Sequence, residues 1–382
     1  MDSDIEPFHA IEISRMAHSL EAKGRSVIHM EFGQPSCGAP RAAIAAAHKV
    51  LDSDPMGYWE SQPLKERIAR HYKDTYDVSV GPDQVILTCG ASAALVLALL
   101  TAFKPGDRIA LARPGYVAYR NTIRALSMVP VEIPCGPETG FQLSRELIDR
   151  VQPAPRGLVI ASPANPTGTV LEKQSMRAIS ELCSERQIQI VSDEIYHKLT
   201  YEERAHSILE FTSSAIVINS FSKYFAMAGW RLGWLLSPRD KLSRARTLVG
   251  NLFLSAPSLS QHAALAALDC HDELDGHVHE YRKNRDLLVD ALPKFGLASI
   301  SKPGGAFYVY ADVTDFTDDS FTFCKKMLED VGVAAAPGID FDPVDGVRFI
   351  RLSFAISNRQ VHEAISRLLP WFSSLKRDRQ MR

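Results

Sequence analysis

The stretch SFSKYFAMAGWRLGW, from Ser220 to Trp234, contains the most informative lysine of this 382-residue chain. Lys223 follows AIVIN, an apolar run that predicts a strand, and aromatic and small residues surround it. An isolated Ser-x-Ser-Lys is most often a solvated loop, but these surroundings predict a partly desolvated amine. Desolvation lowers the pKa of a lysine and makes it a nucleophile toward carbonyl carbon. Ser220, Ser222 and Arg231 are donors that could hold a phosphate nearby.

Strands and helices alternate on both sides of this stretch. Apolar runs predict strands at 85–88, 108–112, 128–134, 158–161, 188–193, 215–219 and 230–236. Helical patterns separate them at 91–103, 143–151 and 175–186. The strand segments are apolar throughout, as expected when both faces of a sheet are covered. The pattern therefore predicts an α/β fold, with a mostly parallel sheet flanked by helices.

The pattern changes beyond about residue 260. A long charged helix is expected at 271–292, followed by strands at 306–313 and 347–355 and helices at 321–331 and 359–372. Fewer strands between longer helices predict a smaller α+β domain. The first forty residues have no place in the large sheet, so we expect them to pack with that domain. The predicted large domain is 45–275, and the predicted small domain joins 1–44 to 276–382.

Composition and charge narrow the class of protein. Hydrophobic residues make up 46% and charged residues 23%, which is ordinary for a globular protein and excludes a disordered chain. The formal net charge of −2 argues against nucleic acid or an anionic membrane as partner. The first ten residues lack the apolar core of a secretory signal, and the six cysteines are scattered. We expect a cytoplasmic protein with free thiols, no metal site and no membrane span.

Together with Gly229, Gly233 and Trp234, the lysine stretch resembles the motif of the class I/II, fold-type I pyridoxal-phosphate aminotransferases. Three further segments match in order, so the resemblance covers about 31–354. It implies the fold of that family, pyridoxal 5'-phosphate as cofactor, amino-acid and 2-keto-acid substrates, and a homodimer. It also implies that Lys223 is the catalytic residue and binds the cofactor covalently. Ser220, Ser222 and Arg231 would bind the cofactor phosphate.

Two segments carry the residues that the resemblance places around the cofactor ring. In VSDEIYHKLTY, Asp193 would face the ring nitrogen and Tyr196 would bond the phenolic oxygen. Read alone, Asp193 fits a helix cap equally well. In ASPANPTGTV, Asn165 would bond the same oxygen and touch the substrate carboxylate, although a bare N-P-T-G is usually only a turn.

The segment LTCGASAAL, 87–95, reads as a strand, a small-residue turn and a helix start. Unpaired N–H groups at a helix start bind phosphate, and small residues allow close approach. Without the other motifs, an ordinary connection between a strand and a helix is the better interpretation. The resemblance makes Gly90, Ala91 and Ser92 the phosphate cup. It also makes Tyr116, in RPGYVAY, the aromatic residue that stacks on the ring.

Three residues would complete the site. Arg351, in RFIRLSFA, matches the arginine that clamps the substrate α-carboxylate, a task suited to its planar fork. Gly33 matches a glycine whose backbone approaches that carboxylate. Tyr58 matches a tyrosine that reaches the partner subunit's phosphate. The spacer after Tyr58, WESQP, is shorter than the family usually has, so the mouth of the site is expected to differ.

The scaffold leaves other reactions open. A carbon–sulfur β-lyase, or a related elimination or decarboxylation enzyme, uses the same lysine, aspartate and arginine. A non-catalytic sensor would need an attached DNA-binding segment, and the residues before Glu31 do not resemble one. No arginine can be assigned to a distal carboxylate. Tyr58, Trp59 and Tyr116 favour an apolar or aromatic substrate.

Overall fold

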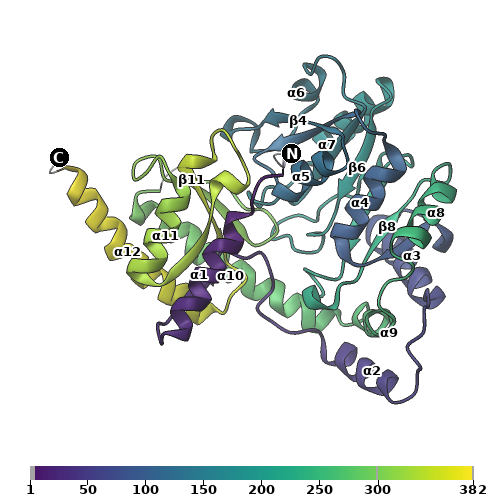
Figure 1. Ribbon diagram of the computed structural model, residues 1–382, viewed down its shortest axis with the longest axis horizontal. Coiled ribbons are helices and arrows are strands. Elements are labelled where there is room, and N and C mark those ends of the chain that lie inside the picture. Colours follow the sequence, from purple (N-terminus) through teal and green to yellow (C-terminus); the bar gives the residue numbers. More distant parts are fainter. Residues whose placement is uncertain (1–4, 298–299, 381–382) are drawn as a thin grey trace.

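The computed structural model describes residues 5–297 and 300–380, and the described residues form two sheets with helices packed around them (Figure 1). The larger sheet has seven strands in the order β2-β8-β7-β6-β5-β3-β4. Its strands are β2 Val85–Thr88, β3 Arg108–Arg113, β4 Val129–Pro134, β5 Gly157–Ala161, β6 Gln189–Asp193, β7 Ile216–Ser220 and β8 Gly233–Leu236. Only β8 runs antiparallel to its neighbours, β2 and β7, so the predicted mostly parallel sheet is confirmed.

Helices cover both faces of this sheet, which explains why its strands are apolar throughout. Within β5, Leu158 and Ile160 pack in one apolar cluster with Ile179, whereas Val159 packs in a second cluster with Leu97. The helices around it are α2 Arg41–Leu51, α3 Gln62–Tyr76, α4 Gly90–Ala102, α5 Val117–Ala125, α6 Arg145–Asp149, α7 Lys173–Glu185, α8 Leu242–Leu252 and α9 Ser258–Ala267. None of the helices in the described ranges combines the length and apolarity needed to cross a bilayer.

The smaller sheet has four strands in the order β1-β10-β11-β9. These are β1 Ile28–Met30, β9 Tyr308–Asp312, β10 Val333–Pro337 and β11 Phe349–Ser353. Its helices are α1 His9–Ala22, α10 His271–Phe295, α11 Ser320–Val331 and α12 Asn358–Gln380. Sequence patterns missed β1 and β10. Most of β10 is alanine, which carries no strand signature, so pairing with β1 and β11 makes it a strand.

The N-terminal segment joins the smaller sheet through β1, which pairs in parallel with β10. The domain division at 44/45 and 275/276 stays a prediction. Both limits fall inside helices, α2 and α10, that are continuous across them.

The parallel strands bring the predicted motifs to one edge of the larger sheet. Chain segments leave β2, β3, β5, β6 and β7 at their carboxyl ends, and these ends lie on the same side because the strands run in one direction. Ligands of open α/β sheets bind at this edge. The smaller sheet lies across from it in Figure 1.

Candidate active site

A cavity of about 490 Å³ contains most of the residues that the sequence singled out. The predicted residues that line it are Gly33, Ala91, Ser92, Tyr116, Asn165, Asp193, Tyr196, Ser222, Lys223, Arg231 and Arg351. Gly90, Ser220 and Tyr58 do not line it. Segments that are far apart in the chain therefore meet at the expected edge of the sheet.

Lys223 lies in the turn that follows β7, with its amine inside the cavity. The amine donates a hydrogen bond to the carbonyl oxygen of Gly33 and lies 5.7 Å from the centre of the Tyr196 ring. Burial, and next the positive charge of Arg351, lower the pKa of Lys223 to about 8. The desolvated amine predicted from the sequence is thus present in the structure, and it can lose a proton near neutral pH.

Asp193 ends β6, and its carboxylate is held by two donors. The Tyr119 hydroxyl donates to Oδ2 at 2.6 Å, and the backbone N–H of Ile195 donates to Oδ1 at 3.0 Å. Burial raises the pKa of Asp193, while both donors and the charge of Lys223 act in the opposite direction. A cation placed against this carboxylate would favour its ionised form further.

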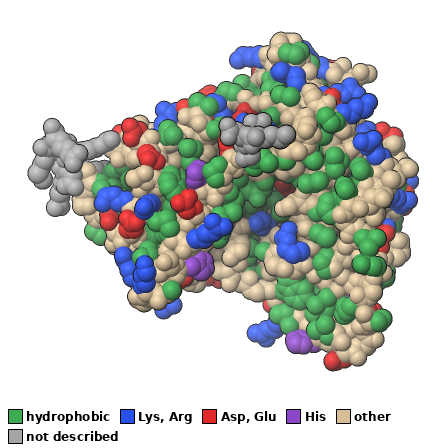
Figure 2. Space-filling view, in the orientation of Figure 1, with side chains coloured by type: hydrophobic (Ala, Val, Ile, Leu, Met, Phe, Trp, Pro, Cys, Tyr) green, Lys and Arg blue, Asp and Glu red, His purple; other side chains and the backbone are tan. Residues whose placement is uncertain are grey.

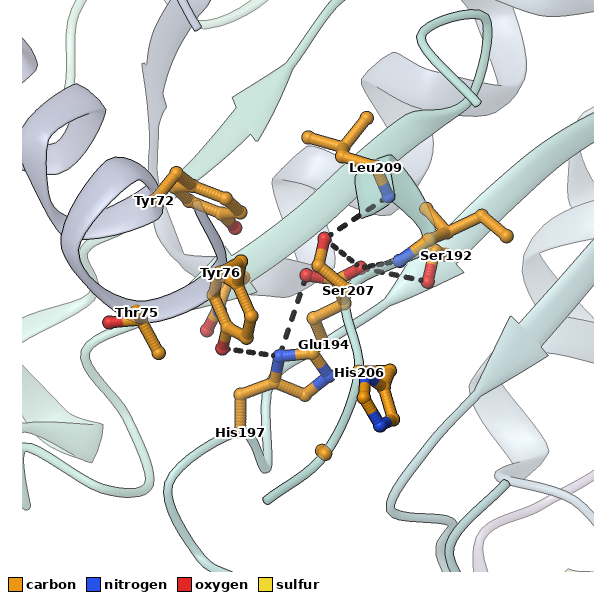
Figure 3. A network of polar contacts seen from close by, with 12 residues as sticks. Tyr72, Thr75, Tyr76, Ser192, Glu194, His197, His206, Ser207 and Leu209 are labelled. Atoms are coloured by element: carbon orange, nitrogen blue, oxygen red, sulfur yellow. Dashed lines mark hydrogen bonds and ion pairs between the residues drawn. The ribbon is translucent and has the colours of Figure 1, made fainter. Parts of the chain in front are cut away.

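A second buried carboxyl group anchors the turn behind Asp193 (Figure 3). Glu194 Oε1 accepts from the Ser207 hydroxyl at 2.9 Å and from the Ile208 N–H at 3.0 Å. Its Oε2 lies 3.5 Å from Nδ1 of His197, which in turn lies 2.7 Å from the Tyr76 hydroxyl. Burial raises the pKa of Glu194 to about 8. The network fixes the backbone that carries Asp193.

The start of α4 and the lysine turn form a cradle for an anion. Gly90 adopts a positive φ of +81°, and a Cβ there would lie 2.4 Å from Nη2 of Arg231. Glycine therefore allows the guanidinium to lie against the helix start, where Cys89 caps no N–H with its side chain. Ser222 lines the cavity beside them. Ser220 lies behind it, its hydroxyl 2.7 Å from that of Ser222, and so shapes the turn.

Arg351 projects from β11 and is 2% exposed. Its Nη1 donates to Asn165 Oδ1 at 2.9 Å, and its Nη2 donates to the carbonyl oxygen of Glu31. The rings of Tyr308 and Phe341 lie 4.5 and 4.7 Å from the guanidinium carbon. These contacts hold the guanidinium group of Arg351 in place, and its buried Nε–H is left without an acceptor among the described residues.

Tyr308 explains why residue 33 is glycine. A Cβ on Gly33 would lie 1.7 Å from the Tyr308 hydroxyl, so any other residue would have to displace this buried ring. That hydroxyl also lies 2.6 Å from the hydroxyl of Tyr196. Sequence reasoning missed Tyr308 and Tyr119. Tyr119 lies in RPGYVAY, only three residues after Tyr116, but nothing in the sequence shows that its hydroxyl meets Asp193.

Tyr58 points away from its own chain. Tyr58 is 84% exposed, although the backbone on either side of it is anchored to α9. Ser258 donates to the carbonyl oxygen of Gly57 at 2.7 Å, and Gln261 donates to that of Trp59 at 2.9 Å. The loop between α2 and α3 thus holds an aromatic side chain out into solvent.

These residues fit pyridoxal phosphate. A desolvated lysine amine, a buried carboxylate at a strand end and an anion cradle at a helix start face one cavity. Lys223 would hold the aldehyde end, Asp193 would face the ring nitrogen, and Ser222, Arg231 and the start of α4 would bind the phosphate.

Comparison with known proteins identifies the family. The model of "Aminotransferase class I and II" matches residues 25–368. The chain is 42% identical to the valine–pyruvate aminotransferase of Mycobacterium tuberculosis, over 97% of both proteins. Among solved structures, it matches an aminotransferase from Mycobacterium tuberculosis with a TM-score of 0.95, at 42% identity over 97% of this chain and 98% of that one. It matches Thermus thermophilus aspartate aminotransferase with maleate with a TM-score of 0.89, at 30% identity over 96% and 97% of the two chains.

All three relatives are named as aminotransferases, and nothing in the comparisons favours the carbon–sulfur β-lyase alternative. The chain therefore belongs to the class I and II aminotransferases, enzymes that use pyridoxal phosphate to move an amino group from an amino acid to a 2-keto acid.

Proposed function

We propose that this aminotransferase takes the amino group from a small apolar L-amino acid, such as valine, and gives it to a short 2-keto acid, such as pyruvate. The observation that carries the proposal is the lining of the cavity. Its remaining wall is mostly apolar and includes Phe8, Phe32, Leu95, Val96 and Ile195. The name of the Mycobacterium tuberculosis relative supports the same choice.

The charged residues of the cavity also favour a neutral side chain on the substrate. Among the described residues that line it, the cations are Lys223, Arg231 and Arg351. We assign the first to the cofactor aldehyde, the second to the phosphate and the third to the α-carboxylate. No cation of this lining is left for a second substrate carboxylate, which would be costly to bury unpaired.

The proposed mechanism assigns one task to each residue. Bound pyridoxal phosphate supplies an aldehyde and an electron-withdrawing ring, the chemistry that transamination needs. Lys223, with a pKa of about 8, moves the proton on the substrate Cα. An ionised Asp193 keeps a proton on the ring nitrogen. Arg351 orients the α-carboxylate with its planar fork, and Asn165, which accepts from Arg351 at 2.9 Å, holds that fork in place.

The N-terminal segment would contribute to substrate choice through Phe8. The Asp340 carboxylate accepts from the backbone N–H groups of His9 and Ala10 at 2.8 Å each. Glu6 forms ion pairs with Arg120 and Arg124 of α5. The N-terminal segment is therefore held by Asp340 on one side of Phe8 and by α5 on the other. These contacts fix the position of the Phe8 ring at the cavity.

A panel of amino donors tests the proposal. We expect kcat/KM with pyruvate to be at least tenfold higher for L-valine than for L-aspartate. Phe8→Ala should raise KM for L-valine more than KM for L-alanine, because only the larger side chain loses apolar contact. Ile5→Ala is the matched control, since Ile5 is exposed and does not line the cavity. A clear preference for L-aspartate would contradict the proposed substrate class.

The working unit in this proposal is a cytoplasmic homodimer. The exposed Tyr58 on its anchored loop would reach the partner's phosphate site, and Figure 2 shows hydrophobic side chains gathered over the nearby region of α2 and α9. Ile44 and Leu51 of α2 are among the exposed large apolar residues. The six free cysteines suit a reducing compartment.

Complementation tests the dimer. Subunits carrying Lys223→Ala should be inactive, and subunits carrying Tyr58→Asp should be weakly active. Under subunit exchange, the mixture should regain activity, because one site of each heterodimer is free of both substitutions. Exchange is verified with tagged subunits. No recovery after verified exchange would show that Tyr58 does not serve the partner's site.

A further inference from the structure

Three side chains of types that can ligate a metal ion lie close together on α1 and β1, outside the cavity. His18 and Glu21 lie three residues apart on α1 and share one face of the helix, and His29 comes from β1. One donor atom from each lies within 4.8 Å of the other two. His29 Nε2 lies 3.3 Å from Glu21 Oε1. Ligands about 2.0 Å from a tetrahedral ion lie about 3.3 Å apart.

Both imidazole rings are oriented by a second contact on Nδ1. Nδ1 of His18 lies 2.8 Å from the carbonyl oxygen of Ser14, and Nδ1 of His29 lies 2.8 Å from Glu31 Oε1. A carbonyl oxygen only accepts hydrogen bonds, so His18 Nδ1 carries the proton and Nε2 has the free lone pair. Carbonyl and carboxylate partners of this kind orient metal-binding histidines in proteins.

Glu31 is the independent observation that calls for a cation. Its side chain is fully buried, and its Oε2 has no partner among the described residues. A buried carboxylate is costly unless positive charge lies close to it. An ion bound to Nε2 of His29 would supply that charge through the ring. The carbonyl oxygen of Glu31 accepts from Arg351, so the backbone of this residue also contacts the arginine assigned to the substrate α-carboxylate.

We propose that His18, Glu21 and His29 bind one divalent transition-metal ion of the zinc type, which ties α1 to β1. Two imidazoles and one carboxylate suit Zn²⁺ rather than Mg²⁺ or Ca²⁺, which prefer oxygen ligands. Three protein ligands leave one tetrahedral position for water. His18 and Glu21 are exposed, so an ion can reach the site. Sequence spacing predicts no such site because His29 meets the helix only through the fold.

Zinc binding by the intact holoenzyme tests the proposal. The enzyme is treated with a chelator, exchanged into chelator-free buffer and dialysed against Zn²⁺, and bound metal and thermal unfolding are measured. We expect the wild type to bind one more Zn²⁺ per chain than His18→Gln or His29→Gln. Zn²⁺ should raise the unfolding temperature of the wild type but not of these variants, and Mg²⁺ should raise neither.

Matched variants separate this site from other zinc-binding groups. His362→Gln changes an exposed histidine of α12 and should bind zinc like the wild type. Glu21→Gln, on an exposed helix face, should weaken Zn²⁺ binding at least tenfold. If a histidine variant does not fold, this variant tests the site in its place. Equal binding by all variants would place the zinc elsewhere. Absence of binding to the wild type would overturn the proposal and leave His29 with only its contacts to Glu21 and Glu31.

Discussion

Replacing Tyr119 by phenylalanine removes one hydroxyl from the site and leaves the ring in place. That hydroxyl donates to Asp193 Oδ2 at 2.6 Å and lowers the pKa of this buried carboxyl group. A hydrogen bond to a charged group contributes about 1.5–3 kcal/mol. Its loss should raise the pKa of Asp193 further, because the hydroxyl stabilises the ionised carboxylate. If the transition state needs the ionised form, kcat/KM should fall roughly tenfold to hundredfold.

The assay is the pH dependence of kcat/KM for the preferred amino donor. The folded-state pKa of Asp193 rises in Tyr119→Phe, so the acid limb of the profile should move to higher pH. A double-mutant cycle with Asp193→Asn, followed in single turnovers, shows whether the hydroxyl acts through Asp193. Tyr310→Phe is the matched control, because Tyr310 is 1% exposed and its hydroxyl has no partner among the described residues.

A wild-type pH profile for Tyr119→Phe would contradict the role assigned to the hydroxyl. An equal loss of activity on Tyr119→Phe in the Asp193→Asn background and in the wild type would also contradict it, because the hydroxyl would then act independently of the carboxylate. A loss shared equally with Tyr310→Phe would indicate a general effect on stability.

Three other changes test separate parts of the site and the fold. Lys223→Ala should abolish turnover, and borohydride treatment of the wild type should fix the cofactor on the peptide that contains Lys223; a label on another lysine would contradict the assignment. Arg351→Lys keeps the charge but loses the fork, so substrate affinity should fall at least tenfold for amino acids, a loss of about 1.4 kcal/mol or more, and little for amines without a carboxylate. Burial lowers the pKa of His71 and of His197 to about 3. The stability that each contributes is present above pH 6.5 and is lost as the pH falls toward 3, by about 2 kcal/mol each at pH 5. Denaturant unfolding should show that His71→Gln loses about 2 kcal/mol less than the wild type between pH 7.5 and 5, and an equal loss would contradict the burial argument.

Much of the larger sheet could be predicted because its signals are local. The predicted strand at 85–88 coincides with β2, and the runs before Asp193 and Lys223 became β6 and β7. A strand buried on both faces is apolar over its whole length, which is visible in a few consecutive residues. Because these strands are parallel, the turns that follow them lie at the same edge of the sheet. The resemblance to the aminotransferase motifs, rather than a local signal, led us to expect Lys223, Asp193 and the start of α4 around one cofactor.

The strand predicted at 230–236 begins later in the structure. Arg231 adopts a positive φ of 52°, and β8 starts at Gly233. The turn that places Arg231 against Gly90 therefore uses residues that an apolar pattern alone assigns to a strand. Contact with α4 overrides the local pattern.

The lysine turn, the order of the motifs and the apolar strands can be read from the chain alone, because each depends on neighbours along it. Which side chains meet depends on the folded arrangement. Arg351 and Asn165 are 186 residues apart, yet they share a hydrogen bond. The hydroxyl of Tyr308 fills the space that a Cβ on Gly33 would need, and Tyr119 rather than another tyrosine holds Asp193. These contacts depend on the packing of the smaller sheet and of α5 against the larger sheet, and no local pattern records that packing.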